Sequence, residues 1–226
     1  MYENRYLQIT TQGSQFYLNI RDYQKHKHFF STIIGNMISF TGTTVKHAKE
    51  ENIQTNIFAD EVVSLENLLK SNKMTPEYYN LLFKSLAEQL RELQNKEQTI
   101  LHFNPKHIYM VKMIGIVRFY YLNPEDVFKT NMERIIINQP FKSTIFTAPE
   151  LRSIKTIPDN KHHKSASFWS LAALITHSLS KTHKIKRPQT QTDFNNILNK
   201  IKYSKLYWAL KRCFEKDPTH REMIYI

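Results

Sequence analysis

The chain has 226 residues with a formal net charge of +12, and 41% of its residues are hydrophobic and 23% charged. This balance excludes a wholly disordered chain, and the length predicts a single domain with its own hydrophobic core. Its 4 glycines lie too far apart to form a G-x-G-x-x-G or a P-loop motif, which excludes Rossmann and P-loop nucleotide sites.

The first part of the chain is predicted to be rich in strands. Apolar residues alternate with other residues from Phe16 to Arg21, which is typical of a half-buried strand, and a second short strand is expected over residues 53–58. Residues 23–37, between these strands, are predicted to form an irregular helix.

From Ser64 onward the pattern changes to helix. Ser64 is a candidate N-cap. Thr75-Pro76-Glu77 is a clearer helix start, because it combines a capping hydroxyl, a proline at the first helical position and an acid in the first turn. Apolar residues then recur on one face as far as position 93, which predicts a long helix.

The rest of the chain is predicted to contain a hairpin, a long loop and two helices. Residues 100–117 favour the hairpin, because proline and glycine interrupt short apolar stretches. Residues 123–165 lack periodicity and are expected to form the loop. Residues 168–175 are apolar almost all round, as in a helix buried on every side, and residues 206–214 carry a final amphipathic stripe.

The composition also indicates the cellular compartment of the protein and the kinds of partner it can bind. The single cysteine, Cys213, excludes an intramolecular disulfide and a cysteine-rich zinc site, and the sequence carries no secretory signal or bilayer-spanning apolar stretch. We therefore expect a cytoplasmic protein with no membrane partner. The basic residues are spread along the chain and the histidine pairs lack further ligands, so no specific nucleic acid, metal or other cofactor is expected.

Three short motifs follow one another in the second half of the chain. Residues 146–151 read FTAPEL, residues 167–172 read SFWSLA, and residues 213–221 read CFEKDPTHR. In this order and spacing they resemble the Ala-Pro-Glu motif, the start of the buried central helix and a C-terminal stretch of protein kinases. Ser167 and Ala172 depart from that pattern, because they stand where the kinase helix has Asp and Gly.

The resemblance implies an α+β, two-lobed kinase-like fold. Residues 1–60 would form a small β-rich N-lobe and residues 61–226 a larger helical C-lobe, within one domain. It also implies a buried ion pair between Glu150 and Arg221 that ties the activation segment to the helical lobe. Residues 56–62 then resemble the hinge between the lobes.

The same resemblance places the catalytic positions on residues of the wrong chemistry. Residues 101–110 stand where kinases have their catalytic loop, so His102 falls at the catalytic Asp and His107 at the metal-binding Asn. Arg118 falls at the metal-binding Asp of the Asp-Phe-Gly motif, and Arg21 at the lysine of the small lobe. These four residues are expected to line a degenerate pseudo-active site, with no catalytic residue among them.

A test that does not depend on alignment register gives the same answer. Phosphoryl transfer needs carboxylates to hold Mg²⁺ and accept a proton, together with a Lys–Glu ion pair. No Asp occurs from Glu61 to Glu125, and no Asp or Glu occurs from Tyr23 to Lys49. The sequence therefore predicts a pseudokinase without enzymatic activity. Its basic site is either an unused surface or a metal-free pocket for an anion or a partner's acidic group.

Among pseudokinases, the reduced size and the excess of Ile and Asn favour a resemblance to the poxvirus homologues of mixed lineage kinase domain-like protein. That resemblance implies a viral decoy that sequesters the host receptor-interacting serine/threonine kinase and so inhibits necroptosis. The segment around Phe29 and Phe30 is one candidate contact surface, but burial in the core of the small lobe is the favoured interpretation.

Two other functions stay open. One is an allosteric pseudokinase subunit that regulates another kinase or a viral replication factor. The other is an atypical nucleotide-dependent enzyme that uses the basic pocket without Mg²⁺.

Overall fold

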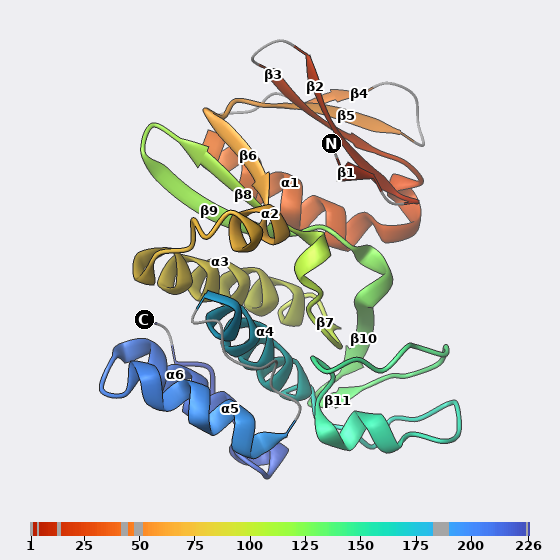
Figure 1. Cartoon of the computed structure of the whole chain (residues 1–226). Helices are drawn as coiled ribbons and strands as arrows, with labels where there is room; N and C mark the ends of the chain where they lie inside the picture. Colours follow the sequence, from red (N-terminus) through yellow and green to blue (C-terminus); the bar gives the residue numbers. More distant parts are fainter. Residues whose placement is uncertain are drawn as a thin grey trace.

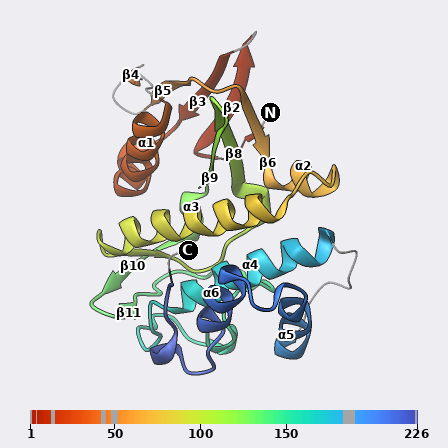
Figure 2. The same ribbon diagram turned by 90° about the vertical axis from the view of Figure 1, so that its left-hand side faces the viewer.

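Figure 1 shows the computed structural model of the chain, which describes residues 2–3, 5–12, 15–41, 45–47, 52–182, 190–224 and 226. Within these ranges the chain forms three small antiparallel sheets and six α-helices, which is compatible with the predicted α+β class. A five-stranded sheet lies at one end of the molecule and helices α4, α5 and α6 at the other, with α3 between them (Figures 1 and 2).

The five-stranded sheet has the strand order β1-β2-β3-β5-β4. Its strands are β1 (Tyr2–Glu3), β2 (Leu7–Gln12), β3 (Gln15–Ile20), β4 (Val45–His47) and β5 (Ile53–Ile57). Leu18 and Ile20 of β3 are buried, and β3 pairs antiparallel with β5. The strands predicted from Phe16 and over residues 53–58 are therefore confirmed.

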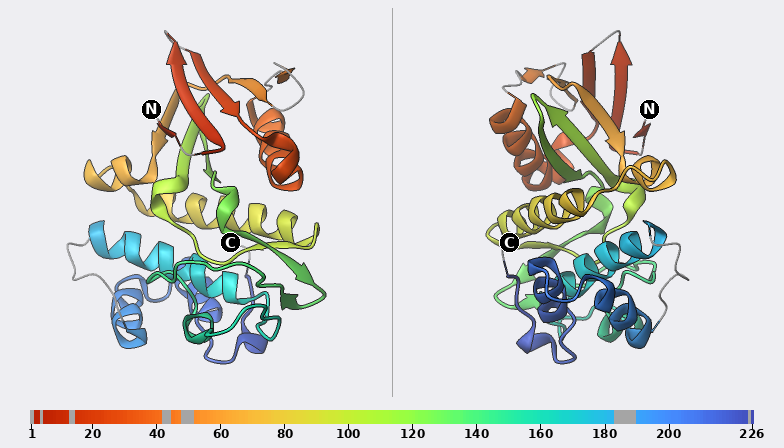
Figure 3. Two further views of the ribbon diagram at one scale, coloured as in Figure 1. Left: turned by 90° about the vertical axis from the view of Figure 1, so that its right-hand side faces the viewer. Right: turned by 60° about the vertical axis from the view of Figure 1, so that its left-hand side comes forward.

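Helix α1 (Lys27–Thr41) follows a short 3₁₀ turn, η1 (Tyr23–His26), and extends the helix predicted over residues 23–37. It lies between the five-stranded sheet and α3 (Figures 1 and 3). The side chains of Phe29 and Phe30 are 1% and 0% exposed. The favoured interpretation, that both rings belong to the core of this end of the molecule, is therefore confirmed, and they are excluded as a contact surface.

A second sheet has the order β6-β8-β9 and contains the predicted hairpin. Its strands are β6 (Glu61–Ser64), β8 (Ile108–Met113) and β9 (Ile116–Tyr121). The hairpin begins at residue 108 rather than 100, because Pro105 starts a 3₁₀ turn, η2 (Pro105–His107). Ile114 and Gly115 form the β8–β9 turn with φ angles of 49° and 76°, as two-residue hairpin turns of type I′ require.

Helices α2 (Leu65–Lys70) and α3 (Pro76–Gln94) begin where the capping signals place them. The Ser64 hydroxyl accepts a hydrogen bond from the Asn67 N–H, and the Thr75 hydroxyl accepts one from the Tyr78 N–H, both at 3.2 Å. Each bond satisfies a backbone donor that a helix start would otherwise leave open.

The long loop predicted over residues 123–165 is partly wrong. This stretch contains two 3₁₀ turns and two strands, which are η3 (Pro124–Asp126), β10 (Val127–Asn131), β11 (Arg134–Ile135) and η4 (Pro149–Ser153). Strand β10 pairs with β11 and, across a long chain separation, with β7 (Gln98–Ile100). Such short, non-local pairing leaves no periodic pattern in the sequence.

The helical end is built on α4 (Ala166–Thr182). Its side chains are buried on every side from Trp169 to Ser180, as predicted for residues 168–175 except that Phe168 is half-buried. Helix α5 (Gln191–Leu198), η5 (Asn199–Ile201), α6 (Lys205–Cys213) and η6 (Pro218–His220) complete it. Helix α6 confirms the predicted final stripe, whereas α5 was not predicted. In the described part of the chain, no helix is both long and apolar enough to cross a membrane.

Candidate functional site

The segment between β7 and β8 carries His102 and His107. Two hydrogen bonds fix its backbone on either side of His102: the Leu101 N–H donates to the Asp126 carbonyl oxygen at 3.0 Å, and the Phe103 N–H donates to the Ser170 hydroxyl at 2.8 Å. The first bond joins it to η3, and the second joins it to α4. His102 is therefore held at a place where three distant parts of the chain meet.

His102 and Asp126 form the centre of a buried polar group, which we call the histidine–aspartate cluster (His102, Tyr121, Asn123 and Asp126). The His102 Nε2 lies 3.1 Å from the Asp126 Oδ1, with the two side chains 9% and 13% exposed. The Tyr121 hydroxyl and the Asn123 amide both donate to the Asp126 Oδ2, the amide at 2.7 Å. Both carboxylate oxygens are therefore already bound by this protein's own side chains.

His107 lies beside this cluster, with its ring centroid 6.2 Å from that of Tyr121 in an edge-to-face arrangement. Burial lowers the pKa of His107, and the nearby Asp126 carboxylate opposes that effect in part. Desolvation disfavours the charged imidazolium. His107 is therefore no strong source of positive charge in this region at neutral pH.

The structure does not bring Arg118 to His102 and His107. Arg118 lies in the middle of β9, paired with Val111, and its guanidinium sits 5.3 Å from the centroid of the Phe40 ring on α1. The chain leaves β9 only at Leu122. The assignment of Arg118 to the first position of an Asp-Phe-Gly-like loop is therefore wrong, because a mid-strand residue cannot occupy a loop that follows the strand.

Arg21 also lies apart from the cluster. It follows β3 and pairs with Glu3 at 3.0 Å, with both side chains about half exposed at 48% and 52%. The four predicted site residues thus separate into two groups: His102 and His107 come together, whereas Arg21 and Arg118 lie elsewhere. The prediction of one basic pocket lined by all four is wrong.

Asp126 is the site residue that the sequence analysis missed. It stands just beyond the window from Glu61 to Glu125 that contains no Asp, and no local motif marks it. Among the described residues, no group of three or more His, Cys, Asp and Glu side chains could hold a metal ion.

Glu150 and Arg221 lie 71 positions apart and form a two-pronged ion pair. The Arg221 Nη1 and Nη2 donate to the two Glu150 carboxylate oxygens at 2.5 and 3.1 Å. The Arg221 side chain is 1% exposed and also donates from Nε to the Glu215 carbonyl oxygen at 2.9 Å. The expected tie between the FTAPEL segment and the end of the chain is therefore present.

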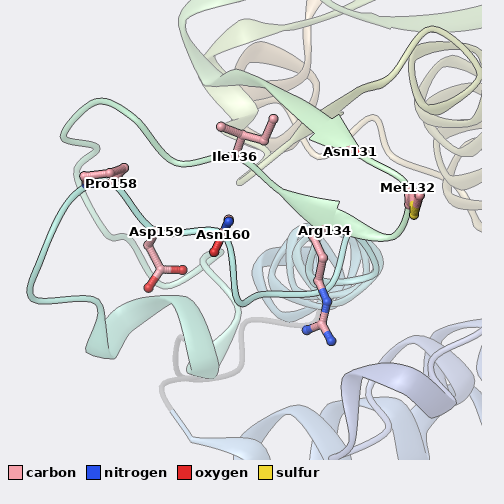
Figure 4. Close-up of a pocket in the computed structure, with 7 residues that line it drawn as sticks. All are labelled: Asn131, Met132, Arg134, Ile136, Pro158, Asp159 and Asn160. Carbon is pink, nitrogen blue, oxygen red and sulfur yellow. The ribbon is translucent and has the colours of Figure 1, made fainter.

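Cavities in the described part of the chain also lie outside the cluster. One of about 440 Å³ lies between the β10–β11 turn and residues 158–160, and Figure 4 shows its seven lining residues. Its charged groups are engaged locally, since the Asp159 carboxylate lies 3.5 Å from His162 and Arg134 donates to the Lys161 carbonyl oxygen. A second cavity of about 450 Å³ lies between η2, residues 144–146 and the end of α4.

Comparison with known protein families and with curated proteins finds no match to this chain. Its function is therefore argued from the geometry of these residues.

Proposed function

We propose that the chain is a kinase-like domain without phosphotransfer activity that acts by binding another protein. The observation that carries this proposal is the state of Asp126, whose two carboxylate oxygens are bound by His102, Tyr121 and Asn123. Kinase chemistry requires carboxylates that are free to hold Mg²⁺ and to accept the substrate hydroxyl proton. A carboxylate whose two oxygens are both occupied by neighbouring side chains stabilises the fold and is not available for phosphoryl transfer.

Other features support the kinase-like part of the proposal. The order of the chain, with a five-stranded sheet and α1 before a helical region, agrees with the order of a kinase small lobe and large lobe. The ion pair between Glu150 of the FTAPEL segment and Arg221 joins two of the three motifs that carry the resemblance. Helix α1 offers no acidic residue for a lysine partner in the small lobe.

A nucleotide-binding assay tests the inactive part of the proposal. Thermal unfolding is measured with ATP in the presence of Mg²⁺ and in the presence of a chelator. We expect no Mg²⁺-dependent stabilisation, whereas a ligand at 100 times its dissociation constant would stabilise the protein by about 2.7 kcal/mol. Mg²⁺-dependent stabilisation would contradict the inactive part of the proposal. ATP turnover or phosphotransfer without Mg²⁺, lost in Arg118→Ala, would instead favour the nucleotide-dependent enzyme.

The β8–β9 turn supports a protein-binding role. Ile114 is 80% exposed and has a left-handed φ of 49°, a conformation that costs a β-branched residue about 1–2 kcal/mol. Ile116 and Phe58 are also exposed, at 61% and 46%. The Ile114 N–H donates to the Asp60 carboxylate at 2.7 Å, which holds the turn beside the β5–β6 connection. These apolar residues are suited to the centre of an interface.

The resemblance of the chain to the poxvirus pseudokinases makes the receptor-interacting kinase of necroptosis the proposed partner. The chain is expressed in cells competent for necroptosis, death is stimulated, and association with that kinase and survival are measured. We expect association and reduced killing. Full killing without association, at expression matching that of the host kinase, would contradict the decoy. Unbiased identification of another bound kinase or a replication factor would favour the allosteric subunit.

A matched pair of variants locates the binding surface. Ile114→Asp is expected to weaken association about tenfold or more, because a charge replaces an apolar contact at the interface. Met132→Asp is the control, since Met132 is 85% exposed and has a φ of 51° in the turn between β10 and β11. Equal association of the two variants would exclude the β8–β9 turn from the interface.

A further inference from the structure

A strongly basic surface lies at the helical end of the molecule, far from the β8–β9 turn. No acidic residue occurs between Asp193 and Glu215, whereas residues 200–212 contain five basic residues. All five side chains are exposed: Lys200, Lys202, Lys205, Lys211 and Arg212. None of the five forms an ion pair within the described part of the chain.

Two exposed aromatic rings lie among these cations. Trp208 is 51% exposed on α6, and Tyr203 is 78% exposed in the turn before it. On the helix surface, residues three and four positions apart are neighbours, so Lys205, Lys211 and Arg212 surround Trp208. We call this surface, formed by Tyr203, Trp208 and the five cations, the basic aromatic face.

The opposite side of α6 explains why these rings cannot turn inward. Leu206, Tyr207, Leu210 and Cys213 are buried against the helical core. The basic aromatic face therefore points outward, at the end of the molecule opposite the five-stranded sheet (Figures 1 and 3). A half-exposed tryptophan surrounded by cations that lack acidic partners indicates a surface for an anionic partner.

We propose that the basic aromatic face binds an anionic lipid surface and lies on it without spanning it. Clusters of four to eight basic residues on an amphipathic helix are typical of binding to phosphatidylserine-rich membranes, and Trp and Tyr favour the headgroup level. Here three of the five cations lie on α6 and two in the segment just before it. The long lysine side chains can reach lipid phosphates while their apolar stems stay beside the rings. This proposal departs from the expectation from sequence that the protein has no membrane partner.

Two observations disfavour the other anionic macromolecules. Four of the five cations are lysines, which are depleted at protein–protein interfaces. Bases stack on open aromatic faces, but the Lys211 ammonium lies 5.4 Å from the centroid of the Trp208 ring and the Lys202 ammonium 5.1 Å from that of Tyr203. A charged lipid surface fits this arrangement better than an acidic protein or a single-stranded nucleic acid.

Tryptophan fluorescence gives a direct test on the full chain. Trp169 is 2% exposed in the core, so a change of emission on binding reports Trp208. Phosphatidylcholine vesicles with and without phosphatidylserine are added, and binding is followed by emission and by sedimentation. We expect the chain to sediment with the anionic vesicles only, with emission shifted to shorter wavelength and binding weakened by salt.

Matched double variants assign the binding to this face. Lys205→Ala with Lys211→Ala should weaken binding about thirty-fold, which corresponds to about 2 kcal/mol. Lys70→Ala with Lys73→Ala, exposed residues at the end of α2 and just beyond it, removes the same charge and should leave binding unchanged. Equal weakening by both pairs, or equal binding to neutral vesicles, would overturn the proposal. Tighter binding of single-stranded DNA than of anionic vesicles, lost in Trp208→Ala, would also overturn it in favour of nucleic acid.

Discussion

Replacing Glu150 by glutamine removes one half of the ion pair that joins the FTAPEL segment to the end of the chain. The variant leaves the Arg221 guanidinium buried without an opposing charge. The glutamine amide oxygen can accept only one of its two former bonds, and the Glu215 carbonyl oxygen remains as the other acceptor. Removing one partner of a buried pair costs about 3–5 kcal/mol, because the remaining charge stays uncompensated. One of the two charge-assisted hydrogen bonds is lost outright, and at about 1.5–3 kcal/mol its loss accounts for a large part of that cost.

The measurement is the free energy of unfolding in urea, with thermal unfolding as a second readout. For a chain of this size, each kcal/mol lowers the melting temperature by about 2–4 °C, so Glu150→Gln should lower it by about 6–20 °C. Glu3→Gln is the matched control, because Glu3 pairs with Arg21 at 3.0 Å with both side chains about half exposed. Such a surface pair contributes about 0–1 kcal/mol.

A double variant separates the charge from the packing. Glu150→Leu with Arg221→Met replaces the buried pair by apolar side chains, which is often neutral for stability. It should therefore recover most of the loss. A small effect of Glu150→Gln, equal to that of Glu3→Gln, would refute the reasoning. A double variant as unstable as Glu150→Gln would show that the loss does not come from the uncompensated charge.

Three further predictions concern buried titratable groups. Burial raises the pKa of the Cys213 thiol to about 12, so a thiol reagent should label it only as fast as the chain unfolds, and rapid labelling of the native protein would contradict this. Burial lowers the pKa of His107 from 6.5, so the unfolded state takes up the proton first and stability falls as pH drops below about 6.5. His107→Gln should reduce that loss in urea titrations across pH, and an unchanged pH dependence would argue against it. Asp126→Asn should cost about 2 kcal/mol or more, because the bonds from His102 and Tyr121 lose their charged acceptor, and unaltered urea unfolding would contradict that role.

Capping residues in the sequence predicted where α2 and α3 begin, whereas no sequence pattern predicted the small sheet of β7, β10 and β11. Ser64 and Thr75 cap α2 and α3 where the sequence places them, since a capping hydroxyl acts within three residues. Strands β7, β10 and β11 are only 3, 5 and 2 residues long and pair across the chain. Their formation depends on what lies beside them, which no local pattern records.

The candidate site likewise contains residues that the sequence could bring together and one that it could not. His102 and His107 lie close together in the sequence, so any assignment of that loop brings both to one place. Asp126 reaches His102 only because β10 pairs with β7 and brings η3 back to the loop. Arg118 was misplaced because the hairpin was expected to end near residue 117, whereas β9 continues to Tyr121.

The histidine–aspartate cluster links the packing of the fold to the absence of a metal site. A site for Mg²⁺ needs carboxylate oxygens that face an open position, but the cluster uses the Asp126 carboxylate to satisfy His102, Tyr121 and Asn123 in a place that water barely reaches. Opening it to a metal would leave those buried donors without their charged acceptor, which carries the full desolvation penalty. Placing a second carboxylate at position 102 would not rebuild a metal site by itself either. Two carboxylates at this distance repel each other, and one of them would have to take up a proton. On the proposed kinase-like function, the loss of catalysis is therefore built into the core of the site, beyond what a single reversion could restore.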